Sequence, residues 1–161
     1  MRAPLSEARV QELRDAIYEV GVVGLSGAFD VGWVDVLDAD VRRAFDEALA
    51  RPGGAVGRGP DRYYVEIHPE QLTNFVELAT HPWLDAVCTA VLGPQYRIVE
   101  VGFDVPGPGA QDQPWHRDFP MPAVTRDRGV LDSLAINVTT VDTEEGMAPF
   151  EIGRASCRER V

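Results

Sequence analysis

The sequence predicts an α+β fold, mainly β, in which N-terminal helices cover an antiparallel β-sandwich. Segments with helical periodicity come first along the chain, and segments rich in β-branched and aromatic residues follow them. The chain also lacks the strand–helix alternation and the glycine-rich fingerprint of a doubly wound parallel sheet. A length of 161 residues is typical of one domain, so we assign residues 1–151 to a single domain.

Helices are expected over residues 6–20, 33–49, 70–78 and 82–92. Ser6 suits the N-cap of the first helix, and Pro69 and Pro82 suit the first turns of the last two. The apolar residues of the second helix predict a core-facing side made of Val34, Leu37, Val41, Phe45 and Leu49.

Strands are expected over residues 21–25, 62–68, 95–105, 131–141 and 148–151. In the fourth of these, side chains alternate between two faces of the strand. One face is apolar and consists of Leu134, Ile136 and Val138; the other consists of Ala135, Asn137 and Thr139. This second face fits either a site wall or an ordinary solvent-exposed surface.

Composition excludes several classes of function. A formal charge of −11 argues against a nucleic-acid partner, which requires a basic surface. No apolar run reaches membrane-spanning length and no secretory leader is seen, so we expect a cytoplasmic protein. All 15 basic residues are arginines, which excludes lysine chemistry and is typical of a GC-rich bacterial genome. Cys88 lies in an apolar helical pattern and is interpreted as a buried structural thiol.

The last ten residues, 152–161, differ from the rest of the chain. They show no strand alternation and place three arginines within seven positions. They also match, codon for codon, the translation of a common short-read sequencing adapter. We therefore interpret 152–161 as a non-native tail and exclude Cys157 from any functional role. On this interpretation the natural reading frame continues beyond Glu151 with different residues.

His116 and Asp118 are the candidate metal ligands. Residues two apart on a strand share a face, so both side chains can reach one ion. An imidazole and a carboxylate are two of the three ligands in the 2-His-1-carboxylate site of iron(II) oxygenases. A His-x-Asp triplet alone is weak evidence, because it also fits a solvated strand end.

The surroundings of His116 strengthen that interpretation. The chain reads VEVGFDVP at 99–106, PWHRDFP at 114–120, LAINVTTVD at 134–142 and APFE at 148–151. Together these segments resemble the phytanoyl-CoA dioxygenase family, over roughly residues 60–151. The resemblance implies a partial double-stranded β-helix (jelly roll) that lacks its C-terminal strands, with His116 and Asp118 as the first two ligands of Fe(II).

The resemblance also implies 2-oxoglutarate as cosubstrate, O₂ as oxidant and a small organic or acyl substrate. Asn137 and Thr139 are then candidates for hydrogen bonds to 2-oxoglutarate. Because Asp118 is present, hydroxylation is favoured over halogenation, for which related enzymes vacate this position. The alternative is a non-catalytic jelly-roll binding protein of the same superfamily.

The family's second iron-binding histidine and its 2-oxoglutarate-binding arginine are expected downstream of Glu151. His68 and His81 precede the motif and are interpreted as a strand-end residue and a helix cap. The chain as given is therefore expected to be an inactive fragment with exposed apolar faces and a tendency to aggregate.

Overall fold

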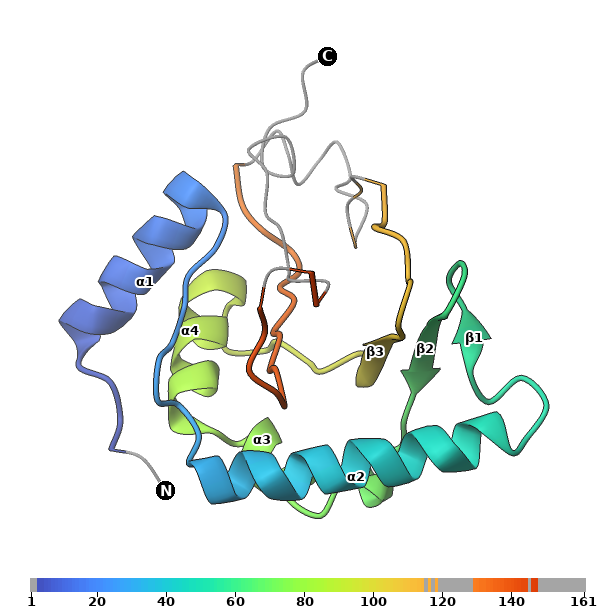
Figure 1. Ribbon diagram of the computed structural model, residues 1–161. Coiled ribbons are helices and arrows are strands. Elements are labelled where there is room, and N and C mark those ends of the chain that lie inside the picture. The colour runs from blue at the N-terminus through green and yellow to red at the C-terminus, as the bar shows by residue number, and fades with distance from the viewer. Residues whose placement is uncertain (1–2, 115, 117, 119–128, 145, 148–161) are drawn as a thin grey trace.

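The computed structural model describes residues 3–114, 116, 118, 129–144, 146 and 147 (Figure 1). This part of the chain mixes helices with a small antiparallel sheet. The helices are α1 (Glu7–Val20), α2 (Val31–Leu49), α3 (Phe75–Ala79), α4 (Pro82–Leu92) and the 3₁₀ turn η1 (Pro69–Gln71); the strands are β1 (Val56–Gly57), β2 (Arg62–Glu66) and β3 (Gly102–Pro106). None of the described helices is both long and apolar enough to cross a bilayer.

Helix α1 begins and ends at the residues that its sequence indicates. The Ser6 side chain accepts a hydrogen bond from the backbone N–H of Arg9 at 3.3 Å, which confirms Ser6 as the N-cap. Gly21 ends the helix with a φ of 92°, a left-handed conformation that glycine adopts without strain. Its N–H donates to the Ile17 carbonyl at 2.9 Å.

Helices α1 and α4 pack against each other around an apolar core, called here the α1–α4 core. Its buried residues are Leu13, Ile17, Val87 and Val91. The bounds of α4 agree with those expected from Pro82 and Gly93. Cys88 is buried in α4, as predicted, and burial together with the Asp85 charge raises the pKa of its thiol.

His81 is the N-cap of α4, as expected from the sequence. Its Nδ1 accepts a hydrogen bond from the Trp83 backbone N–H at 3.3 Å, and its Nε2 lies 2.9 Å from the Ala28 carbonyl. A carbonyl can only accept, so Nε2 carries the proton and the ring is the neutral Nε2–H tautomer. His81 is 6% exposed, and it joins the start of α4 to the loop before α2.

The second core lies between α2 and the sheet. The residues of α2 that are most deeply buried there are not the ones that the sequence predicts. Ala44 and Ala48 are almost fully buried, whereas Leu49 is 53% exposed. Leu37 and Phe45 pack beside the alanines, against Val65 and Ile67. The prediction was wrong about Leu49 because it counted only large side chains; close approach of a helix to a sheet instead favours small ones.

The sheet has the order β1–β2–β3, with both pairs antiparallel. In the second pair Val65 lies opposite Phe103, and Glu66 lies opposite Gly102. A Cβ atom at Gly102 would lie 2.9 Å from the Val65 carbonyl oxygen, so a larger residue there would push the strands apart. The expected strand 95–105 is confirmed only from residue 102, because only that part pairs with β2. Likewise, 62–68 is a strand only as far as Glu66, and 70–78 is η1 followed by α3.

Two other expected strands, 21–25 and 131–141, are not strands in the structure. Neither segment forms a backbone ladder with another described segment, and a strand requires one. The prediction of a mainly β fold is therefore wrong for the described residues, because more of them lie in helices than in strands. The expected strand 148–151 and the tail 152–161 lie outside the described residues.

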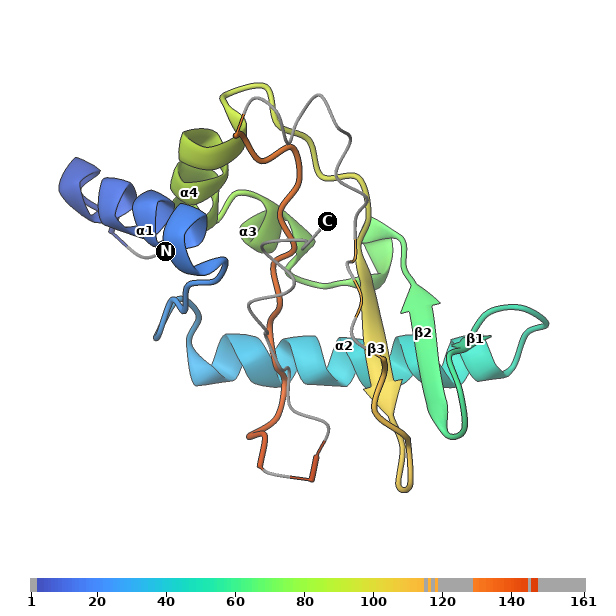
Figure 2. The same ribbon diagram turned by 90° about the horizontal axis from the view of Figure 1, so that it is seen from above.

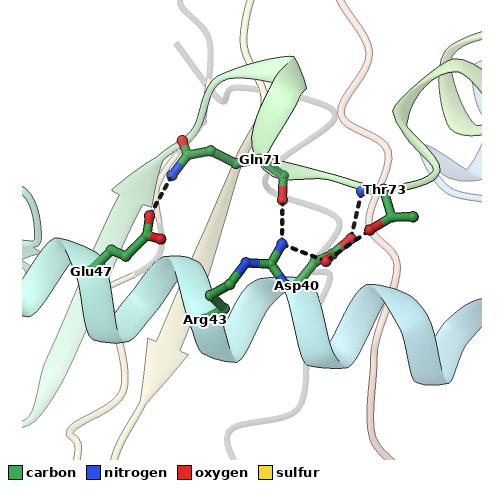
Figure 3. A network of polar contacts seen from close by, with 5 residues as sticks. All are labelled: Asp40, Arg43, Glu47, Gln71 and Thr73. Atoms are coloured by element: carbon green, nitrogen blue, oxygen red, sulfur yellow. Dashed lines mark hydrogen bonds and ion pairs between the residues drawn. The ribbon is translucent and has the colours of Figure 1, made fainter.

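The carboxylate of Asp40 fastens α2 to the chain between η1 and α3 (Figure 3). Its two oxygens accept hydrogen bonds from the Thr73 backbone N–H at 2.6 Å and the Thr73 hydroxyl at 3.1 Å. Arg43 donates to Asp40 at 2.6 Å and to the Gln71 carbonyl at 3.0 Å. Glu47 extends the network by accepting a hydrogen bond from the Gln71 side chain at 3.4 Å. Burial raises the pKa of Asp40, but the hydrogen bonds from Thr73 and Arg43 outweigh burial, and the pKa lies below its ordinary value of 3.8.

Replacing Asp40 is expected to destabilise the fold. Asp40→Ala leaves the Thr73 N–H without its acceptor, which costs about 1–3 kcal/mol in the free energy of unfolding measured with urea. Asp46→Ala, an exposed site on the same helix, is the matched control and should change that energy by less than about 0.5 kcal/mol.

The pH dependence of this difference has a defined sign. Because the folded-state pKa of Asp40 is lowered, its contribution is complete above about pH 4 and disappears as pH falls through the folded-state pKa. A difference between wild type and Asp40→Ala that grows on acidification would contradict the account.

Removing the imidazole of His81 is also expected to destabilise the protein. His81→Ala loses the cap of α4 and the bond to Ala28, which together stabilise by about 1–3 kcal/mol. His81→Asn retains a capping oxygen and should lose less. Equal urea midpoints for wild type and His81→Ala would show that the cap contributes nothing.

Candidate metal centre

His116 and Asp118 lie side by side after the loop that follows β3. Their Nε2 and Oδ1 atoms are 3.2 Å apart, and both side chains are about half exposed, at 47% and 49%. The His116 Nδ1 lies 2.8 Å from the Pro114 carbonyl oxygen. The structure therefore brings the two predicted ligands together on an accessible surface, with the imidazole held from its far side.

The hydrogen bond to Pro114 assigns the roles of the two imidazole nitrogens. Nδ1 must donate to the carbonyl, so in the neutral ring Nε2 has a free lone pair directed to the Asp118 side. A backbone carbonyl on one ring nitrogen is the usual support for a histidine that binds a metal through the other. With a protonated ring, the same pair is an exposed ion pair.

The donor set fits a first-row transition metal. Two ligands at right angles, each about 2.1 Å from an ion, are about 3 Å apart, close to the 3.2 Å between Nε2 and Oδ1. Imidazole and carboxylate are also ligand types that iron(II) accepts. Among the described residues, however, no third His, Cys, Asp or Glu joins this pair.

Asn137 and Thr139 lie in the described segment 129–144. Both are exposed, as is Ala135, whereas Leu134, Val138 and Thr140 are partly covered. The expected alternation of exposure is thus largely retained in a segment that is not a strand; Ile136, at 49% exposure, departs from it. Within the described residues, neither Asn137 nor Thr139 hydrogen-bonds to His116 or Asp118.

The other two histidines serve the fold. His81 caps α4, as described above, and His68 is the N-cap of η1, with its N–H donating to the Gln71 side chain at 2.9 Å. His68 follows the end of β2, which agrees with its interpretation as a strand-end residue.

Sequence reasoning did not single out Tyr18 or Asp38, which contact the segment bearing Asn137 and Thr139. The Tyr18 hydroxyl accepts a hydrogen bond from the Leu131 N–H at 3.3 Å. The Thr140 side chain lies beside the Asp38 carboxylate, whose pKa is lowered by Arg42 and then by Thr140. Both contacts join residues about a hundred positions apart, and no local pattern at Tyr18 or Asp38 indicates them.

Comparison with known proteins identifies the family. No curated protein and no solved structure matches the chain significantly. The model of the phytanoyl-CoA dioxygenase family matches residues 1–147, a span that includes His116, Asp118, Asn137 and Thr139. The match covers most of the chain and agrees with the resemblance of the motifs around His116. The chain belongs to the phytanoyl-CoA dioxygenase family.

Proposed function

We propose that this protein is a non-haem Fe(II)- and 2-oxoglutarate-dependent dioxygenase that hydroxylates a small organic or acyl substrate. The observation that carries the proposal is the His116–Asp118 donor pair, 3.2 Å apart, in a chain of an oxygenase family. Family membership supports dioxygenase chemistry in general. The cosubstrate and the substrate class are what the family resemblance implies, and the metal is inferred from that resemblance together with the donor pair.

His116 and Asp118 would hold the metal through Nε2 and Oδ1. The Pro114 carbonyl keeps Nδ1 protonated, which fixes the tautomer and directs the Nε2 lone pair to the metal side. Bound Fe(II) would supply the O₂ chemistry that amino-acid side chains lack. Because Asp118 occupies the carboxylate position, hydroxylation is the favoured outcome over halogenation.

Asn137 and Thr139 are the proposed contacts for 2-oxoglutarate. An amide N–H and a hydroxyl both donate hydrogen bonds to a carboxylate, and both side chains are exposed. Asn137 and Thr139 would bind 2-oxoglutarate and orient it, so that it reacts from a fixed position and not by a chance encounter in solution.

The proposal extends to the whole domain. Residues 1–151 are taken as part of a cytoplasmic jelly-roll dioxygenase, with 152–161 as a non-native tail. A second histidine and an arginine, required by the family's chemistry, would follow in the natural frame. The chain as given is then an inactive fragment. If a complete frame lacked both residues, the non-catalytic binding protein would be the better description.

The isolated chain is expected to bind divalent metal weakly and through His116. In an anaerobic titration with Mn(II) as a redox-stable stand-in, His116→Ala should weaken binding by at least about tenfold, since even residues that only support a ligand contribute that much. His68→Ala is the matched control and should leave the affinity unchanged, because His68 caps η1. Equal affinities for wild type and His116→Ala would remove His116 from the metal site.

A chain that includes the downstream residues is expected to release succinate only when 2-oxoglutarate and Fe(II) are present. His116→Ala should lower that release by more than about 100-fold, because losing a direct ligand exceeds the effect of losing a supporting residue. His68→Ala should retain the rate. Succinate release that is undiminished in His116→Ala would refute the assignment.

A further inference from the structure

The segment 129–144, called here the docked segment, lies between the helices and the sheet. In both views it runs between α4 on one side and β3 on the other, and it passes α2 (Figures 1 and 2). It forms no ladder with the described strands, and its contacts with the helices include a hydrogen bond to Tyr18.

The first contact is with the α1–α4 pair. Leu131 and Leu134 pack against the α1–α4 core, and the Leu131 N–H donates to the Tyr18 hydroxyl at 3.3 Å. Arg14 holds Tyr18 in turn, with its guanidinium 4.9 Å from the centre of the phenol ring. The same guanidinium donates through Nε to the Ala90 carbonyl of α4 at 3.1 Å. The Tyr18 hydroxyl is therefore a positioned acceptor.

The second contact is with α2, nine residues further along the docked segment. The Thr140 side chain lies beside the carboxylate of Asp38. Asp38 is itself oriented by Arg42, whose Nε donates to it at 2.6 Å. The segment is thus anchored at both ends of the stretch that carries Asn137 and Thr139.

Two anchors matter because covered and exposed side chains largely alternate along this segment. A shift of one residue would exchange the exposed Asn137 and Thr139 for the partly covered Val138 and Thr140. In a strand within a sheet, the ladder sets the register. The docked segment has no ladder, and its contacts with α1 and α2 are available to set its register.

We propose that Tyr18 and Asp38 are positioning residues, which set the register of the docked segment so that Asn137 and Thr139 are presented for 2-oxoglutarate. The contacts described above support the claim that Tyr18 and Asp38 set the register. The claim that Asn137 and Thr139 bind 2-oxoglutarate rests on the proposed function. Neither residue touches a reacting group; both act through the backbone of residues 131–140.

The test compares two variants with two matched controls. Tyr18→Phe removes only the hydroxyl that bonds Leu131, and Asp38→Ala removes the carboxylate beside Thr140. Tyr96→Phe removes a phenol hydroxyl that instead bonds Asp85 at 2.8 Å. Asp46→Ala removes an exposed carboxylate from the same helix and leaves Asp38 with Arg42 and Thr140.

The first readout is the rate of proteolytic cleavage within 129–144 under native conditions, with global stability measured in parallel. Tyr18→Phe and Asp38→Ala should each raise that rate about three- to tenfold, the equivalent of one hydrogen bond, beyond any change in global unfolding. The controls should stay within about twofold of wild type. Cleavage that does not rise, or rises only in proportion to global unfolding, overturns the positioning role.

The second readout separates positioning from general stability. In a catalytically competent form, Tyr18→Phe should raise the KM for 2-oxoglutarate by a similar factor while kcat changes less. A local loosening with an unchanged KM would overturn the link to the cosubstrate. Because cleavage needs no catalysis, a failure of the proposed dioxygenase function would leave the proteolysis result valid and would be recognised separately.

Discussion

The buried carboxylate of Asp40 is the interaction on which the arrangement of the described residues depends. It bonds Thr73 directly and reaches Gln71 through Arg43, and so joins α2 to the chain that leaves the sheet and enters α3 and α4 (Figure 3). The same helix presents Ala44 and Ala48 to the sheet and Asp38 to the docked segment. One helix therefore contacts all three parts, and a shift in its position would displace each of them. A charge this deeply buried is tolerated because Thr73 and Arg43 satisfy it.

The two parts of the candidate site are positioned in different ways. His116 and Asp118 lie in a loop, half exposed, where a metal and small cosubstrates can enter. The Pro114 carbonyl supplies a local support for one of them without any long-range contact. Asn137 and Thr139, in contrast, depend on residues far along the chain for their placement. A site assembled from both therefore combines local geometry with the packing of the whole domain.

The sequence predicts a structural feature well when the interactions that determine it join residues close together in the chain. The bounds of α1 and α4 were predicted because Ser6, Pro82 and Gly93 act within one helical turn. The closeness of His116 and Asp118 was predicted because the two residues are only two positions apart in the sequence. The core side of α2 was misjudged because the approach of β2 selects Ala44 over Leu49. The strand 131–141 was expected from its composition, but a strand exists only with a partner, and composition does not supply one. The contacts of Tyr18 and Asp38 join distant segments and leave no local signal.

The central proposal is that His116 and Asp118 are two of the ligands of an iron site. The most direct measurement is a longer sequencing read through the same locus, past the codon for Glu151. We expect that read to replace Ile152–Val161 with strand-forming sequence that contains a histidine followed by an arginine. A longer frame that lacks both would contradict the oxygenase assignment and leave His116 and Asp118 as an exposed ion pair.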